Sequence, residues 1–487
     1  MNARRKEAVS GGLSIRPAVV CIAACLSIVQ LATADELPDS VQRVLTSLDI
    51  PPDNVSVLVR ELGSPEPLLS YLPSEPRNPA SVMKLVTTWS GLELLGPAYT
   101  WPTEVYFIGD FDGQRLYGDL GIKGFGDPFL VIEEFWKVLR ALRRIGLHEI
   151  EGDLLLDDSF FDVPLEDPGA FDGQPYRTYN VVPSALLVNF KAVRFFFLAD
   201  SANRRVLLSS DPELPNLNIR NRIDLVDGPC RGYQSGISFH IDDPETMSRV
   251  IFEGEFPARC NNYSLSRTVL EHDSYTFGLF RSLWSDLGGS LEGRLNNGPI
   301  PENADLVVTW RSPPLGEVIR SINKNSNNVM TRQLLLTIGA EFRGVPGKEL
   351  DGIEVINEHL QSLGIHDGSL QLVNGAGLSR ESRVSARLLV DMLEAATRHA
   401  YAPEFMASLS IAGLDGTTRN RFDQASGNGV MHVKTGRLDH VSALAGYVHG
   451  SDGKIYAITI LMNSTDAHRG LGQEFEEAVM RWLHSEI

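Results

Sequence analysis

The sequence predicts an α+β fold in which an antiparallel sheet flanked by helices is interrupted by a large, mostly-β insertion of one or two subdomains. Residues from about 55 to 95 have the pattern of a strand pair followed by a helix, and residues after Leu315 have that of a helix pair, three strands and a helix. Between about 101 and 304, Gly-Asp turns separate short β-branched and aromatic runs, which is typical of β structure. The outer segments therefore complete one sheet around the middle.

The first outer segment places two polar residues on one helical face. Val55–Leu62 and Leu68–Leu72 have strand patterns and form the opening hairpin. A turn at 78–81 leads into apolar residues at helical spacing, and the helix stops at Gly96-Pro97. This predicts Ser81 at a helix N-terminus, with Lys84 one turn later on the same face.

The second outer segment supplies the rest of the predicted sheet. Helical spacing starts at Leu315, is interrupted at Lys324-Asn325-Ser326 and resumes from Val329 to Ile338. Three antiparallel strands and a last helix follow, at Val430–Lys434, Val441–His449, Ile455–Met462 and about Phe475–His484.

The length also predicts more than one domain, because single cores stop growing at roughly 250 to 300 residues. The chain has 487 residues. We expect one domain from 35–100 together with 305–487, and inserted domains at 101–304 with an inner subdomain at about 189–262.

The N-terminus has the pattern of an export signal. Basic residues up to Arg16 precede an apolar stretch from Ala18 to Leu31 and the small-x-small sequence Ala32-Thr33-Ala34. We expect cleavage after about Ala34, a periplasmic location and no stable membrane span after signal removal. A membrane anchor and lipidation at Cys25 remain as alternatives; the apolar stretch is shorter than the ~20 residues of a spanning helix.

Composition and cysteine content exclude some partners. The formal net charge is −18, which disfavours a nucleic-acid partner. Signal removal leaves Cys230 and Cys260, for which the oxidising compartment favours a disulfide, with two buried free thiols as the alternative. No histidine or cysteine cluster has metal-ligand spacing, so the sequence predicts no metal and no cofactor.

Three short motifs carry the predicted chemistry. Ser81 and Lys84 supply a hydroxyl and an amine that can accept its proton once burial lowers the pKa of the amine. Ser326-Asn327-Asn328 lies at a helix break, and Lys434-Thr435-Gly436 ends a predicted strand, where Gly436 allows close backbone approach. Taken singly, these motifs also fit an N-cap with a solvated lysine, a polar turn and a hairpin end.

Together, Ser-x-x-Lys, Ser-x-Asn and Lys-Thr-Gly resemble the motif set of β-lactamases and penicillin-binding proteins. The sequences 78–84, 322–328 and 434–447 are similar to the class C low-molecular-mass penicillin-binding proteins, the D-alanyl-D-alanine carboxypeptidase/endopeptidase group. The similarity extends to 116–128 and to 412–417, and the family fills the gap between its first two motifs with two inserted domains. The resemblance covers nearly all of the mature chain and implies a β-lactamase/transpeptidase-like domain.

The resemblance implies a role for each matching residue. Ser81 would be the nucleophile, Lys84 the general base, and Ser326 with Asn328 the proton relay and substrate anchor. The remaining expected substrate contacts are Lys434 and Thr435 for a terminal carboxylate, the backbone N–H of Arg437 (with that of Ser81) for the oxyanion, and Asp157 near the lysines. Family members often have Ser or Thr where this chain has Arg437.

The implied reaction is hydrolysis of peptidoglycan stem peptides and cross-links through an acyl-enzyme, with β-lactams as covalent inhibitors and no cofactor. Two other functions stay open from sequence alone. One is a β-lactamase or esterase on the same scaffold, and the other is a catalytically silent protein that binds the cell wall or senses penicillin.

Overall fold

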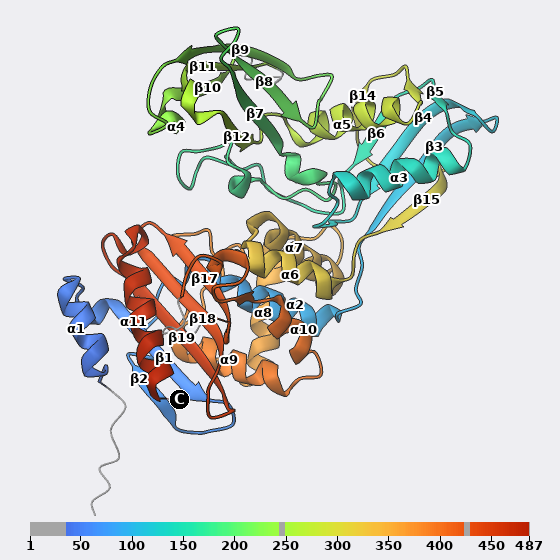
Figure 1. Cartoon of the computed structure of the whole chain (residues 1–487). Coiled ribbons are helices and arrows are strands. Elements are labelled where there is room, and N and C mark those ends of the chain that lie inside the picture. The colour runs from blue at the N-terminus through green and yellow to red at the C-terminus, as the bar shows by residue number, and fades with distance from the viewer. Residues whose placement is uncertain (1–35, 243–248, 423–428, 487) are drawn as a thin grey trace, which may run out of the picture. The chain divides into compact units, whose positions relative to one another are not determined.

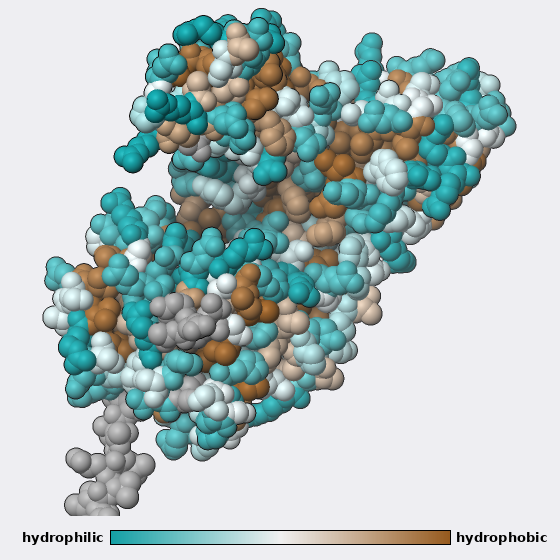
Figure 2. All heavy atoms as spheres, viewed as in Figure 1, coloured by the Kyte–Doolittle hydropathy of each residue, from teal (hydrophilic) through white to brown (hydrophobic). Residues whose placement is uncertain are grey.

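The computed structural model describes residues 36–242, 249–422 and 429–486 (Figure 1). The predicted signal peptide, residues 1–34, lies outside the described residues. In the part of the chain that is described, no helix combines the length and the hydropathy that a membrane span requires. Figure 2 shows hydrophilic residues over most of the visible face, with hydrophobic residues in separate groups.

One antiparallel sheet of six strands joins the N-terminal and C-terminal parts of the chain. Its order is β16-β17-β18-β19-β1-β2, so a strand near residue 60 hydrogen-bonds to one near residue 460. Every pairing in this sheet is antiparallel. Its strands are β1 (Val55–Glu61), β2 (Pro67–Tyr71), β16 (Ser410–Ile411), β17 (Met431–Leu438), β18 (Val441–His449) and β19 (Ile455–Asn463).

Helices cover both faces of this sheet, as Figure 1 shows. Successive side chains of a strand point to opposite faces; Ala443 and Ala445 of β18 pack with α2, α6, α7, α8 and α9, whereas Leu444 packs with α1 and α11. Burial on both faces explains why β18 and β19 are almost continuously apolar. The helices are α1 (Asp39–Ser47), α2 (Lys84–Leu95), α6 (Leu315–Asn325), α7 (Asn328–Arg343), α8 (Glu349–Ser362), α9 (Ala386–Arg398), α10 (Ala402–Ser408) and α11 (Leu471–Glu486).

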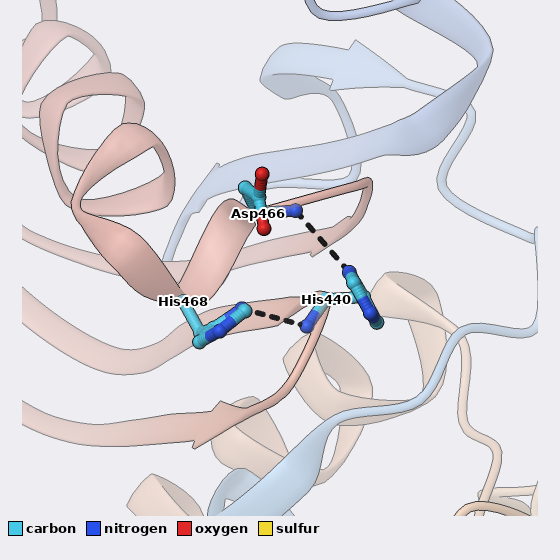
Figure 3. Close-up of side chains that lie close together, drawn as sticks. All are labelled: His440, Asp466 and His468. Carbon is cyan, nitrogen blue, oxygen red and sulfur yellow. Dashed lines mark hydrogen bonds between the residues drawn. The ribbon is translucent and has the colours of Figure 1, made fainter.

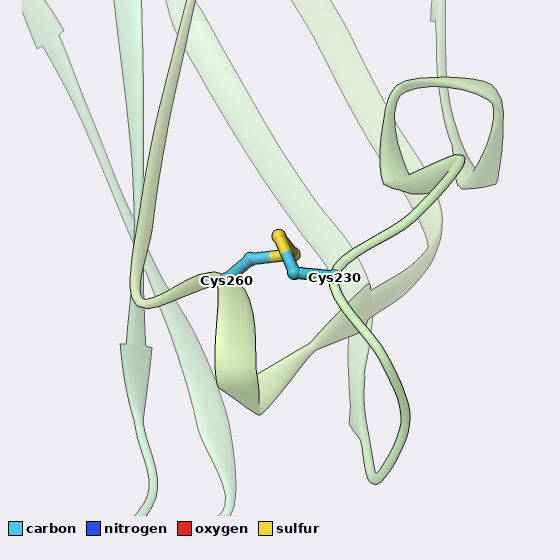
Figure 4. The surroundings of a disulfide bond; sticks show 2 residues. All are labelled: Cys230 and Cys260. Carbon is cyan, nitrogen blue, oxygen red and sulfur yellow. A yellow bond between two sulfur atoms is a disulfide. The ribbon is translucent and has the colours of Figure 1, made fainter.

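Residues between α2 and α6 form three further sheets. A seven-stranded sheet contains β3 (Pro102–Phe111), β4 (Arg115–Gly124), β5 (Glu149–Ile150), β6 (Leu154–Asp157), β13 (Ser290–Leu291), β14 (Leu295–Asn297) and β15 (Asp305–Arg311). Two three-stranded sheets contain β7 (Val193–Asp200), β8 (Arg205–Asp211) and β12 (Asn262–Arg267), and β9 (Asn218–Val226), β10 (Ile237–Ile241) and β11 (Arg249–Pro257). Cys230 and Cys260 form a disulfide beside these sheets (Figure 4).

The α+β class and the helix-flanked antiparallel sheet are confirmed, with three local differences. The inserted segment also contains two long helices, α3 (Ile132–Arg144) and α5 (His272–Asp286). Strand β17 does not end at Lys434 but continues to Leu438, because it pairs with β18 along its whole length. Ser81 lies on a 3₁₀ turn, Ala80–Met83, directly before α2.

Candidate active site

A tightly held turn presents Ser81. The Asn78 carboxamide accepts the Ala80 N–H (2.9 Å) and donates to the Ser379 carbonyl (2.8 Å), while the Asn78 N–H is bound by Asn463 (2.7 Å). Ala80 has a φ of 45°, in the left-handed region that costs a residue with a Cβ about 1 kcal/mol or more. The hydrogen bonds of Asn78 therefore hold the turn in the conformation that positions Ser81.

Lys84 has the environment of a base rather than of a solvated cation. Its side chain is fully buried, and its Nζ lies 2.9 Å from Ser81 Oγ, 2.7 Å from Asn328 Oδ1 and 2.6 Å from the Ala376 carbonyl. Burial, and secondly the charge of Lys434, hold the Lys84 pKa well below its usual value.

The three contacts of Lys84 determine where its lone pair points. A neutral amine has two N–H groups and one lone pair. The Asn328 Oδ1 and the Ala376 carbonyl only accept hydrogen bonds, so they take the two N–H groups. In the structure Lys84 Nζ donates to Ser81 Oγ (2.9 Å); when Lys84 is deprotonated, its lone pair is left for the Ser81 hydroxyl. This geometry would allow Lys84 to accept the Ser81 proton.

A second lysine lies behind Ser326. Ser326 ends α6 in a left-handed conformation (φ 56°), which turns its hydroxyl out of the helix. The Lys434 Nζ donates to Ser326 Oγ (2.8 Å) and to the Thr435 carbonyl (2.7 Å). Lys434 is 0% exposed, and burial lowers its pKa to about 7. Lys434 therefore acts on the site through Ser326 and through its charge on Lys84.

The Ser81 turn and strand β17 face each other across a cleft of about 390 Å³. Gly436 explains their close approach, because a Cβ there would lie 2.4 Å from the Pro79 carbonyl and 3.1 Å from the Ser81 nitrogen. The hydroxyls of Thr417 and Thr435 are 2.8 Å apart. The cleft is lined by Ser81, Ser326, Thr417, Arg421, Thr435, Gly436, Arg437, Ser442 and Gln473.

The structure brings most of the predicted residues together but not Asp157. Asp157 Oδ2 accepts hydrogen bonds from Lys123 (3.0 Å) and the Ile300 N–H (2.9 Å), and Oδ1 accepts from Ser159 (2.6 Å). Its side chain is 0% exposed. Neighbouring protein groups occupy both oxygens of this buried carboxylate, and Asp157 is not among the residues that line the cleft, so the structure does not support the expected substrate contact of Asp157.

Two residues at the site lie outside the three sequence motifs and were not predicted. Tyr179, from the inserted segment, accepts a hydrogen bond from Asn328 Nδ2 through its backbone carbonyl (3.0 Å). Arg421 lines the cleft from the loop before β17. The contact of a backbone carbonyl cannot be predicted from a sequence pattern. Arg421 could have been considered, because it lies close to the Ala412–Thr417 segment.

One cluster has metal-binding residue types. His440, Asp466 and His468 offer ligand atoms within 4.8 Å of one another (Figure 3). Both imidazoles, however, accept a backbone N–H at Nδ1: His440 from Asp466 (3.2 Å) and His468 from His440 (2.9 Å). The neutral rings then carry their proton on Nε2, which removes that lone pair. We interpret the cluster as a pair of hydrogen bonds that connect two loops, and we assign no metal to it.

The fold, and a serine hydroxyl beside a buried lysine, fit one class of protein, the serine hydrolases. The family comparison agrees. The chain belongs to the D-Ala-D-Ala carboxypeptidase 3 (S13) family, whose model matches residues 37–485. It is thus a serine-type D-Ala-D-Ala carboxypeptidase, a peptide hydrolase.

Individual relatives are similar over most of the chain. A D-alanyl-D-alanine carboxypeptidase of Actinomadura sp. strain R39 is 29% identical over 443 residues, which are 89% of this chain and 82% of the relative. The D-alanyl-D-alanine carboxypeptidase DacB of Haemophilus influenzae is 24% identical and covers 84% of this chain and 85% of its own. The crystal structure of penicillin binding protein 4 from that organism has a TM-score of 0.77 at 22% identity and covers 92% of this chain and 100% of its own. The last similarity supports the β-lactamase/transpeptidase-like fold.

Proposed function

We propose that Ser81 hydrolyses the D-alanyl peptide bonds of peptidoglycan stem peptides and of their cross-links, and that β-lactams acylate the same hydroxyl. The observation that carries the proposal is the buried Lys84 Nζ, which lies 2.9 Å from Ser81 Oγ and makes its other two contacts with acceptors of Asn328 and Ala376. In the deprotonated amine these two acceptors take the N–H groups, and the lone pair is left for Ser81. The names of both relatives describe carboxypeptidases for D-alanyl-D-alanine, which supports this substrate class.

The first half of the reaction forms the acyl-enzyme. Ser81 Oγ bonds to the carbonyl carbon of the penultimate D-Ala while its proton passes to Lys84. The oxyanion is stabilised by the backbone N–H groups of Ser81 and Arg437, which the close packing at Gly436 keeps near each other. The C–N bond then breaks, and the proton returns through Ser326 to the leaving nitrogen.

The second half restores the enzyme. Water attacks the ester carbonyl, Lys84 accepts a water proton, and the Ser81–acyl bond breaks with Ser81 regaining its proton. Lys434 holds Ser326 in place through the 2.8 Å hydrogen bond. A leaving D-Ala makes the reaction a carboxypeptidase step, and a leaving diaminopimelate makes it an endopeptidase step.

The same proposal includes the organisation of the protein. We propose a catalytic domain from 35–100 and 305–487, inserted domains at 101–304, and a periplasmic location after signal cleavage near Ala34. The pairing of β1 with β19 supports a catalytic domain built from both outer segments. Hydrogen bonds from Asn328 to Tyr179 and from Gln333 to Ser184 (2.9 Å) support a role of the inserted part at the edge of the cleft.

Ser81→Ala, read out with a fluorescent penicillin and by mass spectrometry of the intact protein, tests the proposal. The unsubstituted protein should gain one penicillin mass, and Ser81→Ala should gain none while its circular dichroism is unchanged. Ser47→Ala, an exposed serine of α1, is the matched control and should label normally. Equal labelling of Ser81→Ala would remove Ser81 from the nucleophile role, and rapid release of hydrolysed penicillin would favour a β-lactamase.

A further inference from the structure

The cleft contains two arginines for which the reaction described above has no use. Arg437 supplies only its backbone N–H to that reaction, and Arg421 supplies nothing. Both side chains line the cleft on the side of β17, together with Thr435. Lys434, the expected carboxylate partner, is 0% exposed and donates hydrogen bonds to Ser326 and the Thr435 carbonyl. A free carboxylate in the cleft therefore meets the arginines and not this lysine.

Arg421 is a fixed donor. Its Nη2 donates to Glu476 Oε2 (2.6 Å), and its guanidinium carbon lies 4.7 Å from the centre of the Phe422 ring. Glu476 is 1% exposed, and its other oxygen accepts the Ser442 hydroxyl (2.6 Å). These contacts orient the planar guanidinium. Its Nε is buried without a hydrogen-bond partner, and among the described residues no group accepts from its Nη1, which leaves this nitrogen for a ligand.

Arg437 supplies uncompensated charge. Its side chain is exposed, and within residues 36–242, 249–422 and 429–486 no ion pair or hydrogen bond engages its guanidinium. Arg421 is neutralised by Glu476, which leaves Arg437 as the net positive charge among the lining residues. In a chain with a formal net charge of −18, a local positive charge in the cleft is the exception.

We infer that Arg421 and Arg437 together bind the carboxylate on the leaving side of the scissile bond. A terminal D-Ala has this carboxylate on the carbon that bears the leaving nitrogen, and so does a cross-link through diaminopimelate. Guanidinium groups suit a carboxylate because their paired N–H groups match its two oxygens. This inference rests on the proposed function and makes these arginines the determinants of specificity for a free carboxylate.

Two substrates that differ only in this group test the inference. One is a diacyl-Lys-D-Ala-D-Ala peptide with a free carboxylate, and the other is its C-terminal carboxamide. The unsubstituted protein should cleave the acid with a kcat/KM about 10- to 100-fold above that of the amide, the size expected for one or two charge-assisted hydrogen bonds. Arg437→Gln should lose most of this preference by lowering kcat/KM for the acid alone.

The design separates specificity from folding. Arg421→Lys retains the charge and should lower kcat/KM for the acid less than Arg421→Gln does, and Arg419→Gln, a neighbouring exposed arginine outside the cleft lining, should change neither substrate. Circular dichroism in each variant confirms that the protein is folded. Equal cleavage of acid and amide by the unsubstituted protein, or equal losses on both substrates in Arg437→Gln, would overturn the inference. Failure to cleave either substrate or to label would instead overturn the proposed function beneath it.

Discussion

Asp127 offers a quantitative test of how burial controls an ionisable group in this fold. Its side chain lies in the loop between β4 and α3 and is 2% exposed. Its Oδ1 accepts the Phe129 N–H (2.7 Å), whereas its Oδ2 is buried with no hydrogen-bond partner among the described residues. Burial raises the pKa of Asp127 from 3.8 to about 7, with a smaller contribution from the charge of Glu134.

The sign of the effect on stability follows from this raised pKa. Below pH 3.8 the carboxyl is protonated in both the folded and the unfolded chain. Between pH 3.8 and about 7 the unfolded chain ionises while the folded chain keeps its proton, so stability falls as pH rises. Each pH unit in that window costs 1.36 kcal/mol, so the full penalty above pH 7 is about 4 kcal/mol. The part that falls between pH 5 and pH 8 is about 2 to 3 kcal/mol.

Asp127→Asn removes this penalty because the carboxamide keeps an acceptor for Phe129 and cannot ionise. Urea unfolding, followed by circular dichroism at pH 5 and pH 8, should show the variant losing about 2 to 3 kcal/mol less stability than the unsubstituted protein. Asp110→Asn, an exposed carboxyl on β3, is the matched control and should leave the pH dependence unchanged. If Asp127→Asn and the unsubstituted protein lost stability in parallel, burial would not be what governs this carboxyl.

Two further predictions concern the catalytic centre. Lys434→Met removes a positive charge beside Lys84, so the Lys84 pKa should rise and the low-pH limb of the pH–rate profile for ester hydrolysis should move to higher pH. Charged and neutral substrates should lose similar rates, and an unmoved limb would refute the coupling. Gly377→Ala places a Cβ 1.9 Å from the Ala80 carbonyl at a residue whose φ is +75°. Penicillin acylation of this variant should therefore slow at least about tenfold. Gly63 also has a left-handed φ but has open space around it, so Gly63→Ala should be acylated normally.

Motif spacing predicted those parts of the site that are local in sequence. Ser81 and Lys84 are one turn apart in any helical start, and the break after α6 follows from the polar run that contains Ser326. The contacts of Asn328 with Tyr179 span 149 residues and involve a backbone carbonyl, so no side-chain pattern encodes them. The family resemblance predicts a substrate contact for Asp157, but its partners come from a neighbouring strand at Lys123 and from the segment after β14 at Ile300.

The missed helices were encoded in the sequence. In α3, Phe135, Val138, Leu139 and Leu142 are buried at spacings of three and four, the pattern of an amphipathic helix. Frequent Gly-Asp turns around this segment favoured a strand interpretation of the whole insertion. The position of Ser81 on a 3₁₀ turn was not encoded in this way, because it depends on Asn78 bonds to Asn463 and Ser379, far away in the chain.

The pairing of β1 with β19 affects when the site can form during synthesis and folding. Val57 lies opposite Ile460, about 400 residues further along the chain, and Asn463 at the end of β19 also binds the backbone of Asn78, three residues before Ser81. Such distant pairings are slow to form, and synthesis completes the N-terminal partner long before its counterpart exists. A partly made chain thus holds Ser81 and Lys84 without the strand that anchors their turn. The hydrolase therefore becomes catalytically active only late in its folding.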